Sequence, residues 1–164
     1  MSDARATGYL RENTSGLELV FERTLEAPVA EIWSALTTSE GTASWIGTWT
    51  GDAREGGTVS FTMTAEDSAE PEDVTILECQ APSRLQVEFS SEAGVWHLEA
   101  DLQEVDGVTR LEFSQLLDQG QDITGIGPGW DFYLDRLVAS RTGAAMPSWD
   151  DYHPALAEHY AGLG

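Results

Sequence analysis

Hydrophobic and polar residues alternate along most of the middle of the chain, the pattern of strands that bury one face. The clearest alternating runs are residues 17–26, 59–64, 85–90, 96–103 and 109–115. A weaker strand at 8–12 is expected to form a hairpin with the first of these runs, and Asp106-Gly107 is a strong hairpin turn. In the run 74–79 apolar residues occur in both phases, which leaves its register open. The pattern predicts an antiparallel meander.

Helical spacing replaces alternation near the start of the chain. Val29, Ile32, Trp33 and Leu36 fall on one face of a helix, and Pro28 before them suits a first helical position. A second short helix is expected to follow directly, capped by Ser39 and running to about residue 45. Two short helices therefore follow the first pair of strands.

A longer helix is predicted near the end of the chain. A glycine-rich approach at 120–129 leads into it, and we interpret residues 125–129 of this approach as a flexible lip. Pro128 suits the start of the helix, and Gly143 can end it. Its broad apolar face comprises Trp130, Tyr133, Leu134, Leu137 and Val138. A last short helix is expected after Pro154. A sheet that curves around one long helix tends to leave a hollow between them.

Length and composition favour a single domain. The chain has 164 residues, a hydrophobic content of 41% and a mean hydropathy of -0.26, enough for a substantial core. We expect residues 1–7 to form an N-terminal tail and residues 8–164 to form the domain. No apolar run approaches the ~20 residues of a membrane helix, and the N-terminus leads into no apolar signal region. A cytoplasmic location is the default expectation.

Charge narrows the range of partners. Eight arginines and no lysine face 29 acidic residues, which gives a formal net charge of -21. Such a field repels nucleic acid and anionic membrane surfaces, so neither is expected as a partner. Cys79 is the only cysteine, which excludes an internal disulfide and a cysteine-based metal site. The three histidines share no ligand spacing, and no metal or cofactor is expected.

Several pieces, taken in order, resemble a known family. They are Phe21-Glu22-Arg23-Thr24-Leu25, Pro28, Ile32-Trp33-Ser34-Ala35-Leu36-Thr37, Trp45, Trp96-His97-Leu98, Gly129-Trp130, Leu134, Leu137, Trp149 and Tyr160. The set resembles the START-like (polyketide cyclase/dehydrase-like, SRPBCC) superfamily and, within it, the family related to the activator of the heat-shock-protein-ninety ATPase. The resemblance covers residues 8–162. It implies an α+β helix-grip fold, in which a curved antiparallel sheet wraps around a long C-terminal helix, with two short helices after the first strands.

The hollow of such a fold is the candidate site. We expect it to be lined by Trp45, Trp49, Phe61, Met63, Val87, Phe89, Leu98, Leu111, Phe113, Gln115, Trp130, Tyr133, Leu134 and Leu137. Gln115 stands where relatives often carry a histidine, and it serves either as a structural hydrogen-bonding group or to orient a ligand. Arg23 shares the phase of the inward residues and needs a carboxylate or an acidic ligand. Its candidate partners are Glu31, Asp131 and Asp135.

An apolar cavity with few polar groups is typical of small-molecule sites. The sequence therefore favours binding of a small lipophilic ligand, with no catalytic residue assigned. Two alternatives stay open, a cyclase- or hydratase-type enzyme that uses the same cavity and a protein-interaction domain with a chaperone partner. A homodimer also stays open.

Overall fold

The computed structural model describes residues 4–64, 70–91, 94–118 and 121–163. Within these ranges one antiparallel sheet has the strand order β1-β2-β8-β7-β6-β5-β4-β3. Its strands are β1 (Tyr9–Asn13), β2 (Gly16–Leu25), β3 (Thr48–Gly51), β4 (Thr58–Thr62), β5 (Glu72–Gln80), β6 (Arg84–Ser91), β7 (Gly94–Val105) and β8 (Val108–Leu116). The helices are α1 (Val29–Thr37), α2 (Ser39–Ala43), α3 (Ile123–Thr142) and α4 (Ala157–Ala161), with a 3-10 turn at Trp149–Asp151.

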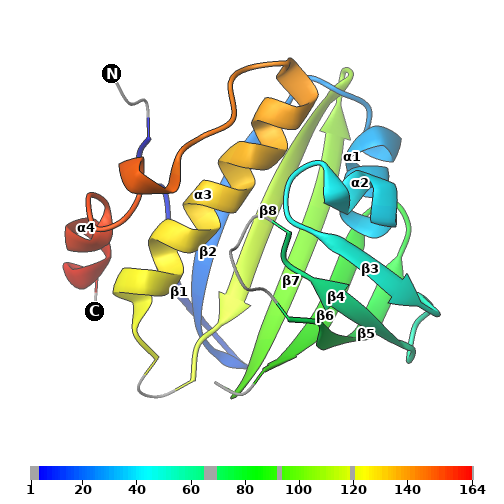
Figure 1. The fold of residues 1–164 in the computed structure, drawn as a ribbon, viewed down its shortest axis with the longest axis horizontal. Helices are drawn as coiled ribbons and strands as arrows, with labels where there is room; N and C mark the ends of the chain where they lie inside the picture. Colours follow the sequence, from blue (N-terminus) through cyan, green and yellow to red (C-terminus); the bar gives the residue numbers. More distant parts are fainter. Residues whose placement is uncertain (1–3, 65–69, 92–93, 119–120, 164) are drawn as a thin grey trace.

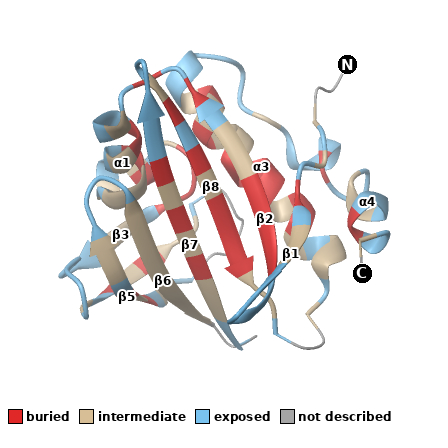
Figure 2. Ribbon diagram, turned by 180° about the vertical axis from the view of Figure 1, so that it is seen from behind, coloured by how far each residue is buried: buried red, intermediate tan, exposed pale blue. Residues whose placement is uncertain are grey.

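The long helix α3 crosses the concave face of the curved sheet, and α1 and α2 lie at one end of it (Figure 1). The sheet is most deeply buried along β2 and β8 (Figure 2). Phe21 pairs with Phe113 between these two strands, and Leu137 of α3 is fully buried. The α+β helix-grip fold expected from the sequence is confirmed. Within the described ranges, no helix is long and apolar enough to cross a membrane.

The hairpin between β7 and β8 follows directly from its turn residues. Asp106 and Gly107 have φ values of 53° and 81°, and the strands pair up to Val105 and Val108 on either side. A two-residue turn with both φ values positive matches the twist of the strands. This turn fixes the register that places Leu111 and Phe113 on the concave face.

A bulge in β5 explains the run that is apolar in both phases. The pairing with β6 shifts between Ile76 and Glu78, so Leu77 is an extra residue and is 43% exposed. An extra residue reverses the alternation beyond it. Val74 and Ile76 therefore face the cavity before the bulge, and Cys79 faces it after the bulge.

The start of α3 differs from the prediction. The helix begins at Ile123, capped by Asp122, whose carboxylate accepts a hydrogen bond from the Thr124 amide at 3.0 Å. Pro128 lies inside the helix, and the segment before it is helical where the sequence suggested a flexible lip. Gly127 has a packing role, because a β-carbon at this position would lie 2.4 Å from the ring of Tyr160.

The ends of other helices and strands also differ slightly from the sequence prediction. Thr38, and not Ser39, caps α2, because its side chain accepts a hydrogen bond from the Gly41 amide. Strand β5 begins at Glu72, within the acidic segment 67–73, and residues 67–69 of that segment lie outside the described ranges. Gly143 ends α3 in the left-handed conformation, with φ of 77°, as predicted.

The three glycines of α3 give a matched mutational series. Gly127→Ala is expected to destabilise the protein by about 1–3 kcal/mol, because the new methyl group overlaps the Tyr160 ring. Gly125→Ala and Gly129→Ala meet nothing within 4 Å, so each is expected to stabilise by about 0.5–1 kcal/mol through helix propensity. Urea denaturation of the three variants measures the difference. Equal effects at all three positions would contradict the Gly127–Tyr160 contact.

Candidate functional site

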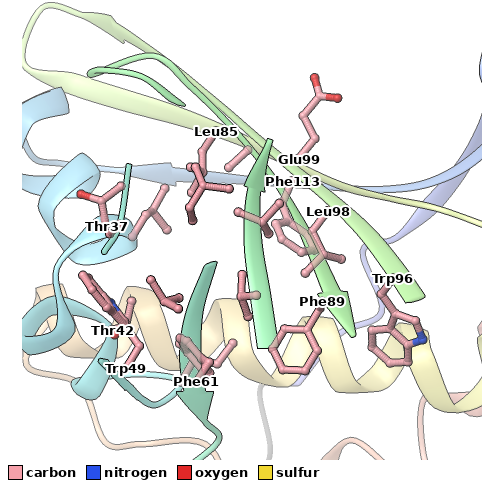
Figure 3. Close-up of a pocket in the computed structure, with 18 of the residues that line it drawn as sticks. Thr37, Thr42, Trp49, Phe61, Leu85, Phe89, Trp96, Leu98, Glu99 and Phe113 are labelled. Atoms are coloured by element: carbon pink, nitrogen blue, oxygen red, sulfur yellow. The ribbon is translucent and has the colours of Figure 1, made fainter. Parts of the chain in front are cut away.

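A cavity of about 330 Å³ lies between the concave face of the sheet, α3, and the end formed by α1 and α2 (Figure 3). Strands β3 to β8 supply its walls through residues on their concave face. Trp130 and Leu134 of α3 close the opposite side. Residues far apart in the sequence thus enclose one mainly apolar space.

Most residues expected to line the hollow do so in the structure. These are Trp45, Trp49, Phe61, Met63, Val87, Phe89, Leu98, Leu111, Phe113, Trp130 and Leu134. Gln115, Tyr133 and Leu137 are buried nearby but are not among the lining residues. Tyr133 packs against Phe132 and Trp130, with ring centroids 5.2 Å and 6.3 Å apart. Leu137 belongs to the hydrophobic core.

The sequence reasoning also missed residues of the lining. They are Leu36, Thr37, Thr42, Ile46, Ala53, Val59, Glu72, Val74, Ile76, Cys79, Leu85, Trp96, Glu99 and Ala100. Strict alternation could have predicted Val59, Leu85 and Ala100. Each lies two residues from an expected lining residue of the same strand and so faces the same side of the sheet. Thr37 and Thr42 had no such signal, because their position depends on how α1 and α2 pack across the end of the sheet.

The polar groups at the helical end of the cavity already have partners. The Thr37 hydroxyl donates to the Trp33 carbonyl at 2.7 Å, and the Thr42 hydroxyl donates to the Ser39 carbonyl at 3.3 Å. The indole N–H of Trp45 donates to the Ala35 carbonyl at 2.8 Å. The first two bonds lie within α1 and α2, and the third ties the segment after α2 to α1.

The Glu99 side chain is directed away from the other labelled residues of the lining (Figure 3). Its carboxylate forms an ion pair with Arg84 at 2.5 Å and accepts a hydrogen bond from Gln86 at 3.1 Å. Burial, followed by the hydrogen bond to Asp101, raises the pKa of Glu99. This carboxylate belongs to a charge cluster on the outer face of the sheet.

Aromatic rings gather where α3 crosses β7 and β8. The ring of Trp130 lies 4.5 Å from that of Phe113 and 6.3 Å from that of Trp96, measured between centroids. Its indole N–H donates to Gln115 Oε1 at 2.7 Å. Gln115 is fully buried, and its Nε2 has no hydrogen-bond partner in the part of the chain that the structure describes. The amide therefore orients Trp130, which forms a wall of the cavity.

Gln115→Leu is expected to cost about 1–3 kcal/mol, because it leaves the buried Trp130 N–H without an acceptor. The same change in a Trp130→Phe background is expected to cost less, since phenylalanine has no donor to leave unpaired. Urea denaturation followed by far-ultraviolet circular dichroism completes the double-mutant cycle. Additive losses would contradict the proposed coupling.

Arg23 lies in a buried polar network with acidic residues of α3. Its guanidinium pairs with Asp131 at 2.9 Å and with Asp135 at 3.0 Å, two of the three expected partners. Thr7 donates to Asp131 through its hydroxyl at 2.5 Å. Tyr160 also donates to Asp131. Arg23 therefore has a structural ion pair and is not among the residues that line the cavity.

The network fastens both ends of the chain to α3. The Tyr160 hydroxyl accepts a hydrogen bond from the Gly8 amide at 3.0 Å, and Tyr152 donates to Asp135 at 2.7 Å. Burial, followed by the charge of Asp131, raises the pKa of Tyr160, so the phenol remains a donor at neutral pH. Ala4 and Ala6, in the segment expected to be a tail, pack against the core.

The sheet, the enclosing helix and the cavity define a helix-grip protein of the START-like superfamily. The family model described as "Activator of Hsp90 ATPase homolog 1-like protein" matches residues 26–140, which is more than half of the chain. The chain belongs to this family. Among curated proteins, none matches the sequence at a significant level.

Solved structures extend the likeness over nearly the whole chain. CalU16 from Micromonospora echinospora, known from a crystal structure, is 26% identical in sequence, with a TM-score of 0.75. The matched region covers 96% of this chain and 95% of the CalU16 chain. The Aha1 dimer from Colwellia psychrerythraea is 18% identical, with a TM-score of 0.65 and coverage of 78% and 98%. DynU16, a protein of the dynemicin biosynthetic locus, is 20% identical, with a TM-score of 0.67 and coverage of 77% and 48%. The last two share the fold alone.

Proposed function

We propose that the protein binds a small lipophilic molecule in the cavity between the sheet and α3. The observation that carries the proposal is the partly open cavity of about 330 Å³ with mainly apolar walls, a size within the usual range of ligand pockets. Apolar walls that the protein's own side chains do not fill favour an occupant. The proposal assigns no catalytic residue and no cofactor.

Affinity would come mainly from apolar burial, at about 25 cal/mol per Å² removed from water. Aromatic walls add shape selectivity, because rings prefer offset or edge-to-face contacts. Trp49 and Phe61 of β3 and β4, Phe89 and Trp96 of β6 and β7, and Trp130 of α3 supply such rings. The ligand we expect is therefore compact and carries flat or branched apolar groups.

Native mass spectrometry of protein purified from its own host, compared with the denatured mass, tests the proposal. A matched pair of variants adds a structural control. Ala100→Phe places a ring in the cavity, whereas Gln103→Phe places the same ring on an exposed position of the same strand. We expect bound mass, or binding of the neutral dye N-phenyl-1-naphthylamine, to be lost only in Ala100→Phe.

Two results would overturn the proposal. One is wild-type protein that carries no small molecule and binds no apolar dye. The other is dye binding that persists unchanged in a folded Ala100→Phe variant, since the dye would then occupy a different surface.

A further inference from the structure

Aromatic side chains are concentrated at one level of the cavity wall. Trp49 of β3, Phe61 of β4, Phe89 of β6 and Trp96 of β7 line the cavity, and the register of the sheet aligns them. Trp49 pairs with Phe61 on the neighbouring strand, and Phe89 pairs with Trp96. The rings of Phe61 and Phe89 meet across β5, with centroids 6.0 Å apart. These four residues form an aromatic row that crosses the strands.

The aromatic row follows the direction of the long helix, and helix α3 adds a further ring to it. Figure 3 shows the four labelled rings in one line beside α3. The ring of Trp130 on α3 lies 6.3 Å from that of Trp96, and its indole N–H donates to Gln115 Oε1 at 2.7 Å. Phe113 turns its ring toward Trp130, with centroids 4.5 Å apart. The orientation of Trp130 is therefore fixed by the protein before any ligand enters.

Aliphatic or small residues occupy a second level of the same strands. Leu85 lies four residues before Phe89 on β6, and its cross-strand partners are Ala100 on β7 and Cys79 on β5. All three line the cavity, and we call them the aliphatic end. Four residues of strand span about 13 Å. The aromatic row and the aliphatic end are therefore separated by about the length of a small ligand.

The two levels favour different chemical groups. Aromatic side chains offer offset and edge-to-face contacts in addition to apolar burial, and only a ring of the ligand can form both. The aliphatic end offers burial of apolar area, which an alkyl group uses equally well. A wholly aliphatic chain would gain no ring contacts and would lose rotational freedom along its entire length. A ligand with a ring at one end and a short alkyl group at the other matches both levels.

We propose that the cavity binds a two-part ligand, in which a flat aromatic ring system lies against the aromatic row and an alkyl group extends toward Cys79, Leu85 and Ala100. This inference rests on the proposed function, because it concerns the ligand of the same cavity. It specifies the chemical class of that ligand and the direction in which the ligand lies.

Three uncharged ketones with the same number of carbon atoms test the ligand class. Hexanophenone has a ring and an alkyl chain, 2-acetonaphthone is almost wholly aromatic, and 2-dodecanone is wholly aliphatic. Burial alone ranks 2-dodecanone first, because it has the largest apolar surface. We expect hexanophenone instead to bind about tenfold more tightly than 2-dodecanone, and 2-acetonaphthone to fall between them. Displacement of N-phenyl-1-naphthylamine from the full chain gives the three dissociation constants.

A matched pair of variants on β6 locates the preference. Phe89→Leu removes a ring from the aromatic row and is expected to narrow the ratio of the 2-dodecanone and hexanophenone dissociation constants severalfold. Leu85→Met conserves side-chain volume at the aliphatic end and is expected to leave the ratio unchanged. Dye binding by each variant shows that its cavity is formed. Equal ratios in both variants and the wild type would contradict a role of the aromatic row.

Cys79, the only cysteine of the chain, reports the direction of the ligand. Methyl methanethiosulfonate is a small uncharged thiol reagent, and mass spectrometry follows its reaction with the protein. At equal occupancy, hexanophenone is expected to slow the modification of Cys79 severalfold, because its alkyl chain covers the thiol. We expect 2-acetonaphthone, which lacks the chain, to leave the rate nearly unchanged. Equal protection by both ketones, or protection by neither, would contradict the proposed direction.

The failure of this inference can be distinguished from the failure of the cavity proposal. Tightest binding of 2-dodecanone would show that apolar area alone determines affinity, which overturns the two-part ligand and leaves the cavity proposal intact. If neither the dye nor any of the three ketones binds, the cavity proposal itself is overturned.

Discussion

Replacing Asp131 with alanine is expected to destabilise the protein by about 3–5 kcal/mol, the usual cost of removing one partner from a buried ion pair. Asp131 is fully buried and accepts hydrogen bonds from Arg23, Thr7 and Tyr160. The substitution would leave the Arg23 guanidinium, whose side chain is 9% exposed, with Asp135 as its remaining carboxylate. It would also remove the acceptor that holds Tyr160, and with it α4, against α3.

Urea denaturation measures the loss, and two controls identify its cause. Asp135→Ala removes a carboxylate that is 30% exposed, so water can replace part of its interactions and a smaller loss is expected. The double variant Arg23→Met, Asp131→Leu removes both charges and is expected to recover much of the stability, because apolar side chains replace buried ion pairs at little cost. If Asp131→Ala costs less than about 1 kcal/mol, the Asp131 carboxylate behaves like that of an exposed ion pair, and the buried ion pair with Arg23 is contradicted.

The sheet could be predicted from the sequence because each strand carries its own signal. A few alternating residues are enough to identify β2, β7 and β8. The same residues indicate which side chains face inward. The inward phase of β8 placed Leu111 and Phe113 in the cavity wall, where the structure has them. The local pattern is sufficient to predict these strands because a period of two residues indicates both the strand and its buried face.

Features that depend on distant contacts could not be predicted. Nothing local explains why residue 127 must be glycine, since a β-carbon there would meet the ring of Tyr160, more than thirty residues later. Thr7 likewise has no local signal for its bond to Asp131, and the register shift in β5 becomes visible only against β6. The end of the cavity formed by α1 and α2 was missed for the same reason.

Raising the NaCl concentration from about 10 mM to about 0.5 M is expected to stabilise the protein by on the order of 3 kcal/mol, or roughly 6–12 °C in the unfolding midpoint. The cause is the excess of 29 acidic residues over eight arginines, which repel one another most strongly in the compact state. Added salt shortens the Debye length from about 30 Å at 0.01 M to below about 8 Å.

Screening also weakens ion pairs, so the sign of the effect depends on which contribution is larger. Eight arginines can neutralise only a minority of the acidic residues, and exposed pairs are worth about 0–1 kcal/mol each. Repulsion among the unpaired carboxylates therefore dominates, and stability should rise with salt.

Thermal unfolding in NaCl and KCl at equal ionic strength tests this, because screening depends on ionic strength and is largely complete below about 0.5 M. A triple variant, Glu12→Gln, Glu26→Gln, Asp150→Asn, removes three exposed charges. It is expected to be more stable than the wild type in low salt and to respond less to added salt. Stability that falls with salt would mean that the ion pairs of Arg11, Arg23 and Arg84 outweigh the repulsion of all the other carboxylates.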